Sequence, residues 1–296
     1  MKRQILFLLI PLLLLSGCAS NEFSLRHDVA LSFDSERIAY NVVGKGKTSL
    51  IFIHGWSCDS RYWQKQIPVF AKDYQVITVD LAGHGHSSMN RSVFSMLSFA
   101  NDVKAIVDKE SINRAVLIGH SMGGGVIAEA ARLMPERVVG IVGIDTLHNV
   151  TEQIAQSVID EIVKPFKADF KSAAQDFVSP MFLKGTDQQL MNWVKEDMSC
   201  APKEIAINAF RNYLGQYVNG EAAIVFEDIT IPVVSINSKL WPTASEENRK
   251  HIKHYKLFYI EQAGHFPMLE KPKEFNLLLK KALNSIGTEL KEPNAA

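Results

Sequence analysis

Ser121 lies in the sequence pattern that most directly suggests covalent chemistry. The segment Gly119-His120-Ser121-Met122-Gly123 follows an apolar run at residues 114–118, typical of a buried strand, and precedes an apolar helical stretch at 122–133. A G-x-S-x-G segment between strand and helix forms a tight turn, in which side chains at the glycine positions would crowd the neighbouring elements. The sequence therefore predicts that Ser121 is an exposed nucleophile. A glycine-rich helix start with an incidental serine is the alternative.

A second loop could stabilise negative charge beside that serine. His54-Gly55-Trp56 follows the apolar run at residues 49–53, so a backbone N–H at the end of that strand could point at a developing oxyanion. The residue after the nucleophile supplies the other donor in such sites. We therefore expect the backbone amides of Trp56 and Met122 to form an oxyanion hole.

Four segments occur in an order that resembles the α/β-hydrolase fold family. They are HGWSCDSRYW at 54–63, DLAGHGHS at 80–87, GHSMGG at 119–124 and AGHFPMLEKP at 263–272. The resemblance extends over about residues 38–283 and is weakest between 147 and 228. It implies a mostly parallel α/β sheet with helices on both faces and a helical cap inserted between two strands. It also implies that His265, which follows the last predicted strand, is the general base.

The third member of a catalytic triad is harder to place. The family usually carries its acid just after the strand at 231–237, but residues 238–242 contain no carboxylate, and Lys239 stands about where an aspartate is expected. Some members carry the acid one strand earlier, which favours Asp145 at the end of the predicted strand 138–144. Asp145 could instead only bond loop amides. Glu246, Glu247 or no acid at all remain open.

Lys239 suggests a further hypothesis. If it reached Asp145, it would pair with that carboxylate and compete with His265, and Lys239→Asp would then raise ester turnover. A lysine that points into solvent is the alternative.

Alternating strand-like and helix-like runs predict the elements that hold these residues. Predicted strands lie at 37–43, 49–53, 75–80, 114–118, 138–144, 233–236 and 256–260, and predicted helices at 61–70, 97–109, 122–133 and 273–285. Residues 147–228 show helical periodicity without a confident buried strand, which indicates a cap. We therefore divide the chain into a core of residues 25–146 and 229–287, a cap of 147–228 and a polar tail of 288–296.

The N-terminus predicts export and lipid attachment. Basic residues at 2 and 3 precede an apolar run at 5–15, which is too short to span a bilayer but typical of a signal peptide. Leu15-Ser16-Gly17-Cys18 resembles the lipobox of bacterial lipoproteins, which implies a signal peptide at 1–17, an acylated Cys18 and a tether at 18–24. An ordinary signal peptide or an uncleaved anchor is the alternative. We expect a lipid-anchored protein of the bacterial cell envelope, on the periplasmic side of an outer membrane where the host has one.

Composition narrows the remaining classes. The 32 basic and 32 acidic side chains balance, so we expect no nucleic-acid partner. No nucleotide-binding glycine motif is present, and His84-Gly85-His86 has no accompanying ligand cluster, so we expect neither an organic cofactor nor a metal. In an oxidising compartment Cys58 and Cys200 could form a disulfide or remain free thiols.

Together these features predict a serine hydrolase that acts on a carboxylic ester or related small acyl substrate. A lactonase, a carbon–carbon bond hydrolase and a catalytically impaired ligand-binding protein remain alternatives, the last because the usual acid is missing. Aromatic and methionine residues of the cap could line an apolar substrate pocket, although such residues more often form a core of their own.

Overall fold

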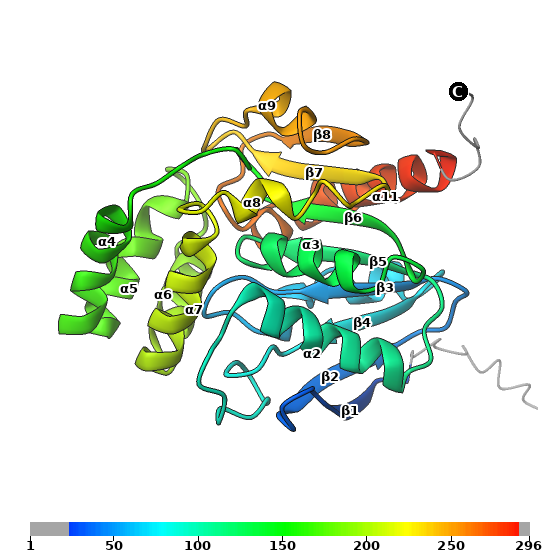
Figure 1. Ribbon diagram of the computed structural model, residues 1–296, viewed down its shortest axis with the longest axis horizontal. Helices are drawn as coiled ribbons and strands as arrows, with labels where there is room; N and C mark the ends of the chain where they lie inside the picture. The colour runs from blue at the N-terminus through cyan, green and yellow to red at the C-terminus, as the bar shows by residue number, and fades with distance from the viewer. Residues whose placement is uncertain (1–23, 290–296) are drawn as a thin grey trace, which may run out of the picture.

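The computed structural model describes residues 24–289, which form one eight-stranded sheet with helices on both faces (Figure 1). The strand order is β1-β2-β4-β3-β5-β6-β7-β8. The strands are β1 (Arg26–Leu31), β2 (Arg37–Val43), β3 (Ser49–Ile53), β4 (Gln75–Val79), β5 (Ala115–His120), β6 (Val138–Ile144), β7 (Val233–Ser238) and β8 (Tyr255–Ile260). β1 and β2 pair antiparallel, β2 pairs antiparallel with β4, and the remaining pairs are parallel.

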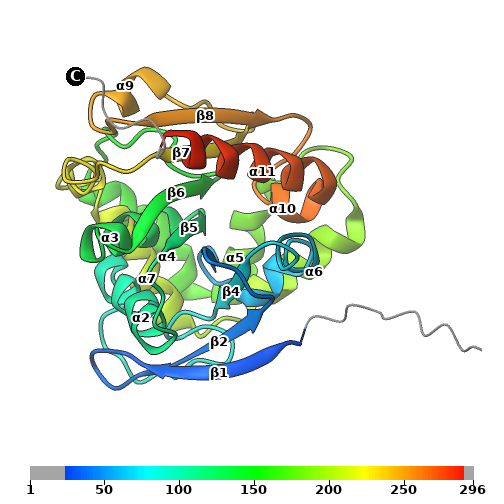
Figure 2. The ribbon, with the colours of Figure 1, turned by 90° about the vertical axis from the view of Figure 1, so that its right-hand side faces the viewer.

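Helices on both sides explain why the central strands are continuously apolar. Every residue of β3 and β5 is buried, as is typical of parallel strands covered on both faces. α2 (Met96–Lys109) and α3 (Gly123–Leu133) lie on one face, and α11 (Pro272–Glu289) lies on the other, against β6, β7 and β8 (Figure 2). The structure thus confirms the predicted fold class.

A group of helices fills the interval between β6 and β7 and lies beyond the carboxyl ends of the parallel strands (Figure 1). Its members are α4 (Gln156–Ala168), α5 (Phe170–Val178), the 3-10 helix η2 (Ser179–Met181), α6 (Gln188–Ser199), α7 (Lys203–Gly215) and α8 (Glu221–Ile224). We call this group the cap. Phe166, Phe177 and Phe210 pack edge to face within it and against Trp56 of the core. Aromatic packing therefore joins the cap to the sheet.

Several elements differ from the sequence predictions. The predicted helix at 61–70 is instead the short 3-10 helix η1 (Ser60–Trp63) followed by α1 (Ile67–Phe70). Pro68 stands in the first turn of α1, where its missing N–H is tolerated, whereas a continuous helix would need that donor. The edge strand β1 was not predicted, and α9 (Ser245–Arg249) and α10 (Pro267–Glu270) are short additions.

The last helix extends to Glu289, so residues 288 and 289 belong to α11 rather than to the predicted tail. The predicted signal peptide at 1–17, Cys18 and all of the tether except Ser24 lie outside the described residues. Between residues 24 and 289, no helix is long and apolar enough to cross a membrane.

Candidate active site

Ser121 stands on a strained turn between β5 and α3. Its φ of 53° lies in the left-handed region, where non-glycine residues are uncommon. A Cβ at Gly119 would collide with the carbonyl of Gly123, and a Cβ at Gly123 would come within 2.8 Å of the carbonyl oxygen of His54. Both glycines are therefore needed for the close approach of strand, turn and helix. The strand–turn–helix setting predicted for Ser121 is present.

The two predicted oxyanion donors flank the serine. Trp56 lies in the loop after β3, and Met122 is the N-cap residue of α3; both line the same cavity as Ser121. Neither backbone amide donates a hydrogen bond to any of residues 24–289. Buried backbone amides are normally paired, so two unpaired amides beside Ser121 are unusual. They are available to donate to a ligand oxygen. The N-terminal end of α3 adds a favourable dipole for negative charge.

His265 and Asp145 form a buried hydrogen bond across the carboxyl edge of the sheet. Nδ1 of His265 donates to Oδ2 of Asp145 at 2.7 Å, and the two side chains are 8% and 0% exposed. The other carboxylate oxygen, Oδ1, accepts a 2.7 Å hydrogen bond from the backbone N–H of Ser238 at the end of β7. A histidine held in this way has its Nε2 free to accept a proton.

Asp145 is ionised in this environment. Burial alone would raise the pKa of its carboxyl group, but the hydrogen bond and charge of His265, together with the Ser238 amide, lower that pKa to about 2. The backbone of Asp145 is also strained, with φ 44°. A buried, ionised carboxylate on a strained loop, hydrogen-bonded to a histidine, is an arrangement typical of functional sites.

The other candidates near the acid position are directed elsewhere. Lys239 does not reach Asp145; its Nζ pairs with Oε1 of Glu261 at 2.6 Å on the surface, so the proposed competition with His265 is wrong. The backbone turns at Ser238 so that an amide, not the lysine side chain, meets Asp145. Glu246 pairs with Arg249 within α9.

Glu247 likewise pairs with Lys250, so neither glutamate of α9 contacts His265. Among the carboxylates weighed from the sequence, Asp145 alone is hydrogen-bonded to the histidine in the described structure.

A carboxylate that the sequence analysis did not select holds the loop of His265. Glu270, at the end of α10, accepts hydrogen bonds from the backbone N–H groups of Gly264 at 3.0 Å and Phe266 at 3.1 Å. It also accepts one from the hydroxyl of Thr186 in the cap at 3.1 Å. Glu270 belongs to the segment AGHFPMLEKP, five residues after His265. That spacing is the sequence feature that could have identified it.

The backbone of His265 is fixed on both sides as well. Its N–H donates to the carbonyl of Met181 in η2 at 2.8 Å, and its carbonyl accepts from Nε2 of His120 at 2.8 Å. A Cβ at Gly264 would collide with the carbonyl of Met181, so this position needs glycine for the close approach of loop and cap. The base loop is thereby attached to the cap by backbone contacts.

A cavity of about 190 Å³ connects these groups. Ser121, His265, Asp145, Trp56 and Met122 all line it, together with Phe177, Met181, Met198, Phe210 and Trp241 from the cap and the loop after β7. No lysine, arginine or glutamate side chain from the described part of the chain lines it. Oγ of Ser121 makes no hydrogen bond with residues 24–289, and the cavity is small and largely apolar. The space suits a small neutral ligand next to the serine.

Known proteins resemble this chain in both sequence and fold. The family model described as "alpha/beta hydrolase fold" matches residues 48–186. An esterase from Exiguobacterium antarcticum superposes with a TM-score of 0.78 at 18% identity, over 88% of this chain and 100% of that chain. The chain has the α/β-hydrolase fold, and its residues 48–186 match the model of that family.

Curated relatives of this α/β-hydrolase fold protein have diverse names. A dihydrolipoyllysine-residue acetyltransferase component of an acetoin cleaving system from Cupriavidus necator is 36% identical over 36% of this chain and 29% of the relative. The chain thus spans less than a third of the acetyltransferase components that it matches. A pimeloyl-[acyl-carrier protein] methyl ester esterase from Wigglesworthia glossinidia brevipalpis is 24% identical over 81% of this chain and 95% of the relative.

His148 is a further member of the site that the sequence analysis did not select. Its Nε2 is buried without a hydrogen-bond partner among residues 24–289 and lies 4.0 Å from Oδ2 of Asp145. Burial lowers the pKa of His148, which keeps the ring neutral. Trp241 packs edge-on against both His148 and His265. Its position three residues after Asp145 is the sequence feature that could have identified His148.

The two cysteines of the described chain are free thiols. Cys58 is buried and lines the cavity, whereas Cys200 is exposed at the end of α6. Burial raises the pKa of Cys58 well above its usual value, so its thiol is protonated. Of the two alternatives, the structure contains the free thiols. Between residues 24 and 289 there is no group of three or more His, Cys, Asp or Glu side chains that could hold a metal ion.

Proposed function

We propose that this α/β-hydrolase fold protein is a serine hydrolase that cleaves small, neutral carboxylic esters. The observation that carries the proposal is the 2.7 Å hydrogen bond between Asp145 and His265, beside Ser121 on its strained turn. These are the groups that nucleophilic acyl transfer requires: a hydroxyl, a base with its Nε2 free, and an acid that fixes the base.

The mechanism follows from the positions of these groups. Oγ of Ser121 attacks the acyl carbon, and Nε2 of His265 takes the hydroxyl proton. Asp145 stabilises the imidazolium that forms. The amides of Trp56 and Met122 donate to the oxyanion of the tetrahedral intermediate. As that intermediate collapses, His265 returns the proton to the leaving alcohol.

Water then attacks the acyl-enzyme, with His265 as base again, and releases the acid and free Ser121. In unliganded enzymes the serine–histidine hydrogen bond is often long and forms only in the substrate complex, which accounts for the unbonded Oγ of Ser121.

The cavity supports the substrate class. Its volume of about 190 Å³ is below the range of about 300–1,000 Å³ that is usual for drug-sized ligands, which favours short acyl groups. Its aromatic and sulfur-containing lining, without a lysine or arginine, favours uncharged esters over acids or phosphates. The esterase names of relatives and structural neighbours agree with this choice.

The ligand-binding alternative depended on a missing acid. Asp145 in contact with His265 supplies an acid, which favours catalysis over binding alone. No observation on the described residues favours a lactonase or a carbon–carbon bond hydrolase over an ester hydrolase.

The test is hydrolysis of short-chain aryl esters by the full chain in detergent, with Ser121→Ala as the control. We expect turnover that the substitution abolishes, and labelling of wild-type protein, but not of the variant, by a fluorophosphonate probe. A folded wild-type protein that neither turns over esters nor is labelled would contradict the proposal.

We also infer that Cys18 is acylated and anchors the domain to the cell envelope. Mass spectrometry of the membrane-extracted chain tests this inference.

A further inference from the structure

The outward face of edge strand β1 carries exposed apolar side chains. Side chains alternate along a strand, so Leu25 and Leu31 point to the same side as His27 and Val29. Leu25 and Leu31 are 51% and 67% exposed, and Phe33, in the turn after β1, is 66% exposed. On the opposite side Ala30 is buried beneath α2, which packs on β1. Figure 2 shows β1 at the rim of the sheet, with no described helix over its outer side.

The charged residues of β1 point the other way. Arg26 forms an ion pair with Glu110, and Asp28 forms one with Lys109, both at the C-terminal end of α2. The outward face therefore has no carboxylate from β1. The same side also carries His27, and Arg37 lies there too because it pairs with Leu31 across the β1–β2 ladder. Edge strands usually expose charges, and this edge also exposes leucine and phenylalanine, at Leu25, Leu31 and Phe33.

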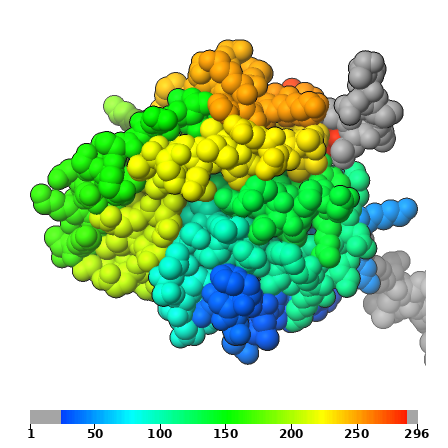
Figure 3. Space-filling view, viewed as in Figure 1, coloured from blue at the N-terminus to red at the C-terminus, as the bar shows by residue number. Residues whose placement is uncertain are grey.

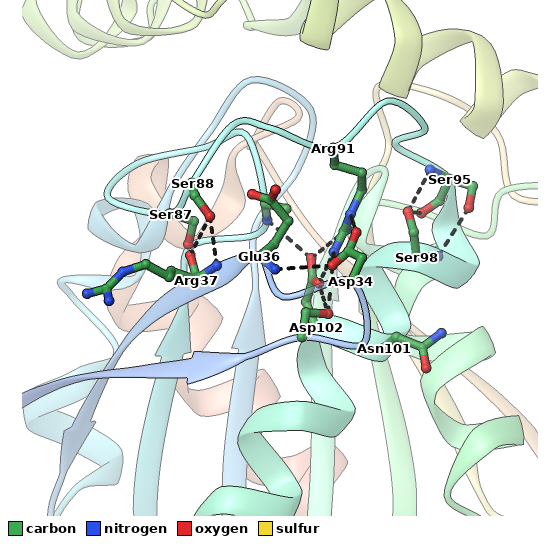
Figure 4. Close-up of polar contacts among 12 residues, drawn as sticks. Asp34, Glu36, Arg37, Ser87, Ser88, Arg91, Ser95, Ser98, Asn101 and Asp102 are labelled. Atoms are coloured by element: carbon green, nitrogen blue, oxygen red, sulfur yellow. Dashed lines mark hydrogen bonds and ion pairs between the residues drawn. The ribbon is translucent and has the colours of Figure 1, made fainter.

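A buried ionic cluster lies beside Phe33. Ser32, which precedes Phe33, donates a 2.6 Å hydrogen bond to Asp102. Asp34, which follows Phe33, accepts one from Nε of Arg91 at 2.7 Å. Arg91 also pairs with Asp102, and its side chain is only 4% exposed. Figure 4 shows this cluster, with Arg37 extending away from it. The ring of Phe33 packs over the guanidinium group of Arg91 at 5.3 Å, and Phe33 remains 66% exposed.

Apolar exposure continues onto the loop after β4. Met89 and Val93 are 49% and 53% exposed, and Val93 lines a shared groove with Phe33. In the space-filling view the blue β1–β2 turn protrudes beside the cyan loop (Figure 3). We call Leu25, Leu31, Phe33, Met89 and Val93 the β1 apolar face. β1 runs in the same direction as β4, so its Phe33 end lies at the sheet edge that carries Ser121.

We propose that the β1 apolar face rests on the surface of a lipid bilayer. The chain that precedes β1 supplies the argument for this occupant: an apolar run at residues 5–15 follows two basic residues. Leu25 lies ten positions after Leu15 in the chain, a span of at most about 36 Å when fully extended. A bilayer that holds the N-terminal segment, or lipid chains on Cys18, therefore keeps β1 within reach of its surface.

The chemistry of the face fits a membrane better than water. Leucine, phenylalanine, valine and methionine side chains gain from burial at the boundary between headgroups and acyl chains. Arg37 suits anionic headgroups. Asp34 and Glu36 line the same groove as Phe33, but Asp34 is paired with Arg91 and Glu36 is buried. The proposal depends on the N-terminal membrane segment and not on the hydrolase activity, so the two can fail separately.

The test measures the depth of single tryptophans. Phe33→Trp and the matched control Leu277→Trp are made in the full chain; Leu277 is 68% exposed on α11, near the opposite edge of the sheet. Each variant is bound to mixed phosphatidylcholine and phosphatidylglycerol vesicles with brominated acyl chains, which quench nearby indoles. Wild-type chain, with its four tryptophans, gives the background.

We expect the fluorescence added by Phe33→Trp to fall by about half or more, because interfacial side chains lie about 5–10 Å into the headgroup boundary. The fluorescence added by Leu277→Trp should not change. Adding Leu31→Glu to Phe33→Trp should remove the quenching, whereas adding Val158→Glu in the cap should not.

Equal quenching of the two tryptophan variants, or none, would overturn the proposal. So would wild-type protein that does not bind the vesicles at all. A concentration-dependent change in the Phe33→Trp signal without vesicles would show that a second copy of the chain covers this face instead.

Discussion

Replacing Asp145 with asparagine removes one charge while keeping the shape of the side chain, and the structure predicts how the new amide will orient. The backbone N–H of Ser238 donates to Oδ1 of Asp145 and still requires an acceptor in the variant. The amide oxygen must therefore face Ser238, which places the amide NH₂ against Nδ1 of His265. That nitrogen must then accept a hydrogen bond, so the ring proton moves to Nε2.

The wrong tautomer is the source of the expected loss. With its proton on Nε2, His265 cannot take the proton of Ser121. The same substitution in serine protease triads lowers kcat by about 10⁴, and we expect a loss of about 10³–10⁴ in kcat/KM here. This corresponds to about 4–5 kcal/mol of transition-state stabilisation. At neutral pH the variant should also lose about 2 kcal/mol of stability, which is the contribution of the ionised carboxylate, although it keeps the Ser238 hydrogen bond.

The assay is kcat/KM for a short-chain aryl ester, with circular dichroism to show that each variant is folded. Glu246→Gln is the matched control: it also neutralises a carboxylate, but on the surface and paired only with Arg249, so its activity should stay within about twofold of wild type. If folded Asp145→Asn kept more than about a tenth of wild-type activity, Asp145 would not act as the triad acid.

Three other predictions concern the same site. Glu270→Gln should lower kcat about tenfold with little change in KM, because a neutral amide holds the base loop less firmly than a carboxylate; an unchanged kcat would make Glu270 irrelevant to positioning. Lys239→Ala should leave ester turnover within about twofold, since its exposed pair with Glu261 contributes little, and a clear rise would restore the idea that Lys239 competes for Asp145. The folded-state pKa of Asp145, about 2 against 3.8, lies below its unfolded value, so its contribution of about 2 kcal/mol should be complete above pH about 4 and lost as pH falls through about 2. Urea unfolding across that range should show a steeper loss for wild type than for Asp145→Asn, and parallel curves would contradict the shift.

Local sequence patterns determined most of the sheet and the nucleophile. Apolar runs of five to seven residues give β3, β5 and β6 because strands buried on both faces have no polar side to expose. Edge strand β1 was not predicted because its pattern is that of neither a buried nor an amphipathic strand. Its side toward α2 carries the paired charges of Arg26 and Asp28, and its other side carries His27, Val29 and Leu31. The turn at Ser121 could be predicted because its geometry depends on its own glycines.

Only the tertiary structure could decide which residue acts as the acid and which groups fix the loop of His265. Asp145 and His265 lie 120 residues apart, on loops after β6 and β8, and they meet because the loop of His265 passes over the end of β7 between them. Whether Lys239 or the Ser238 amide faces the carboxylate depends on the path of the backbone after β7, which no residue pattern encodes. Sequence alone thus determined which residues can react, since that is a property of each local turn. Strand order and loop packing decided which of them are brought into contact, since contact depends on distances between segments that are remote in the chain.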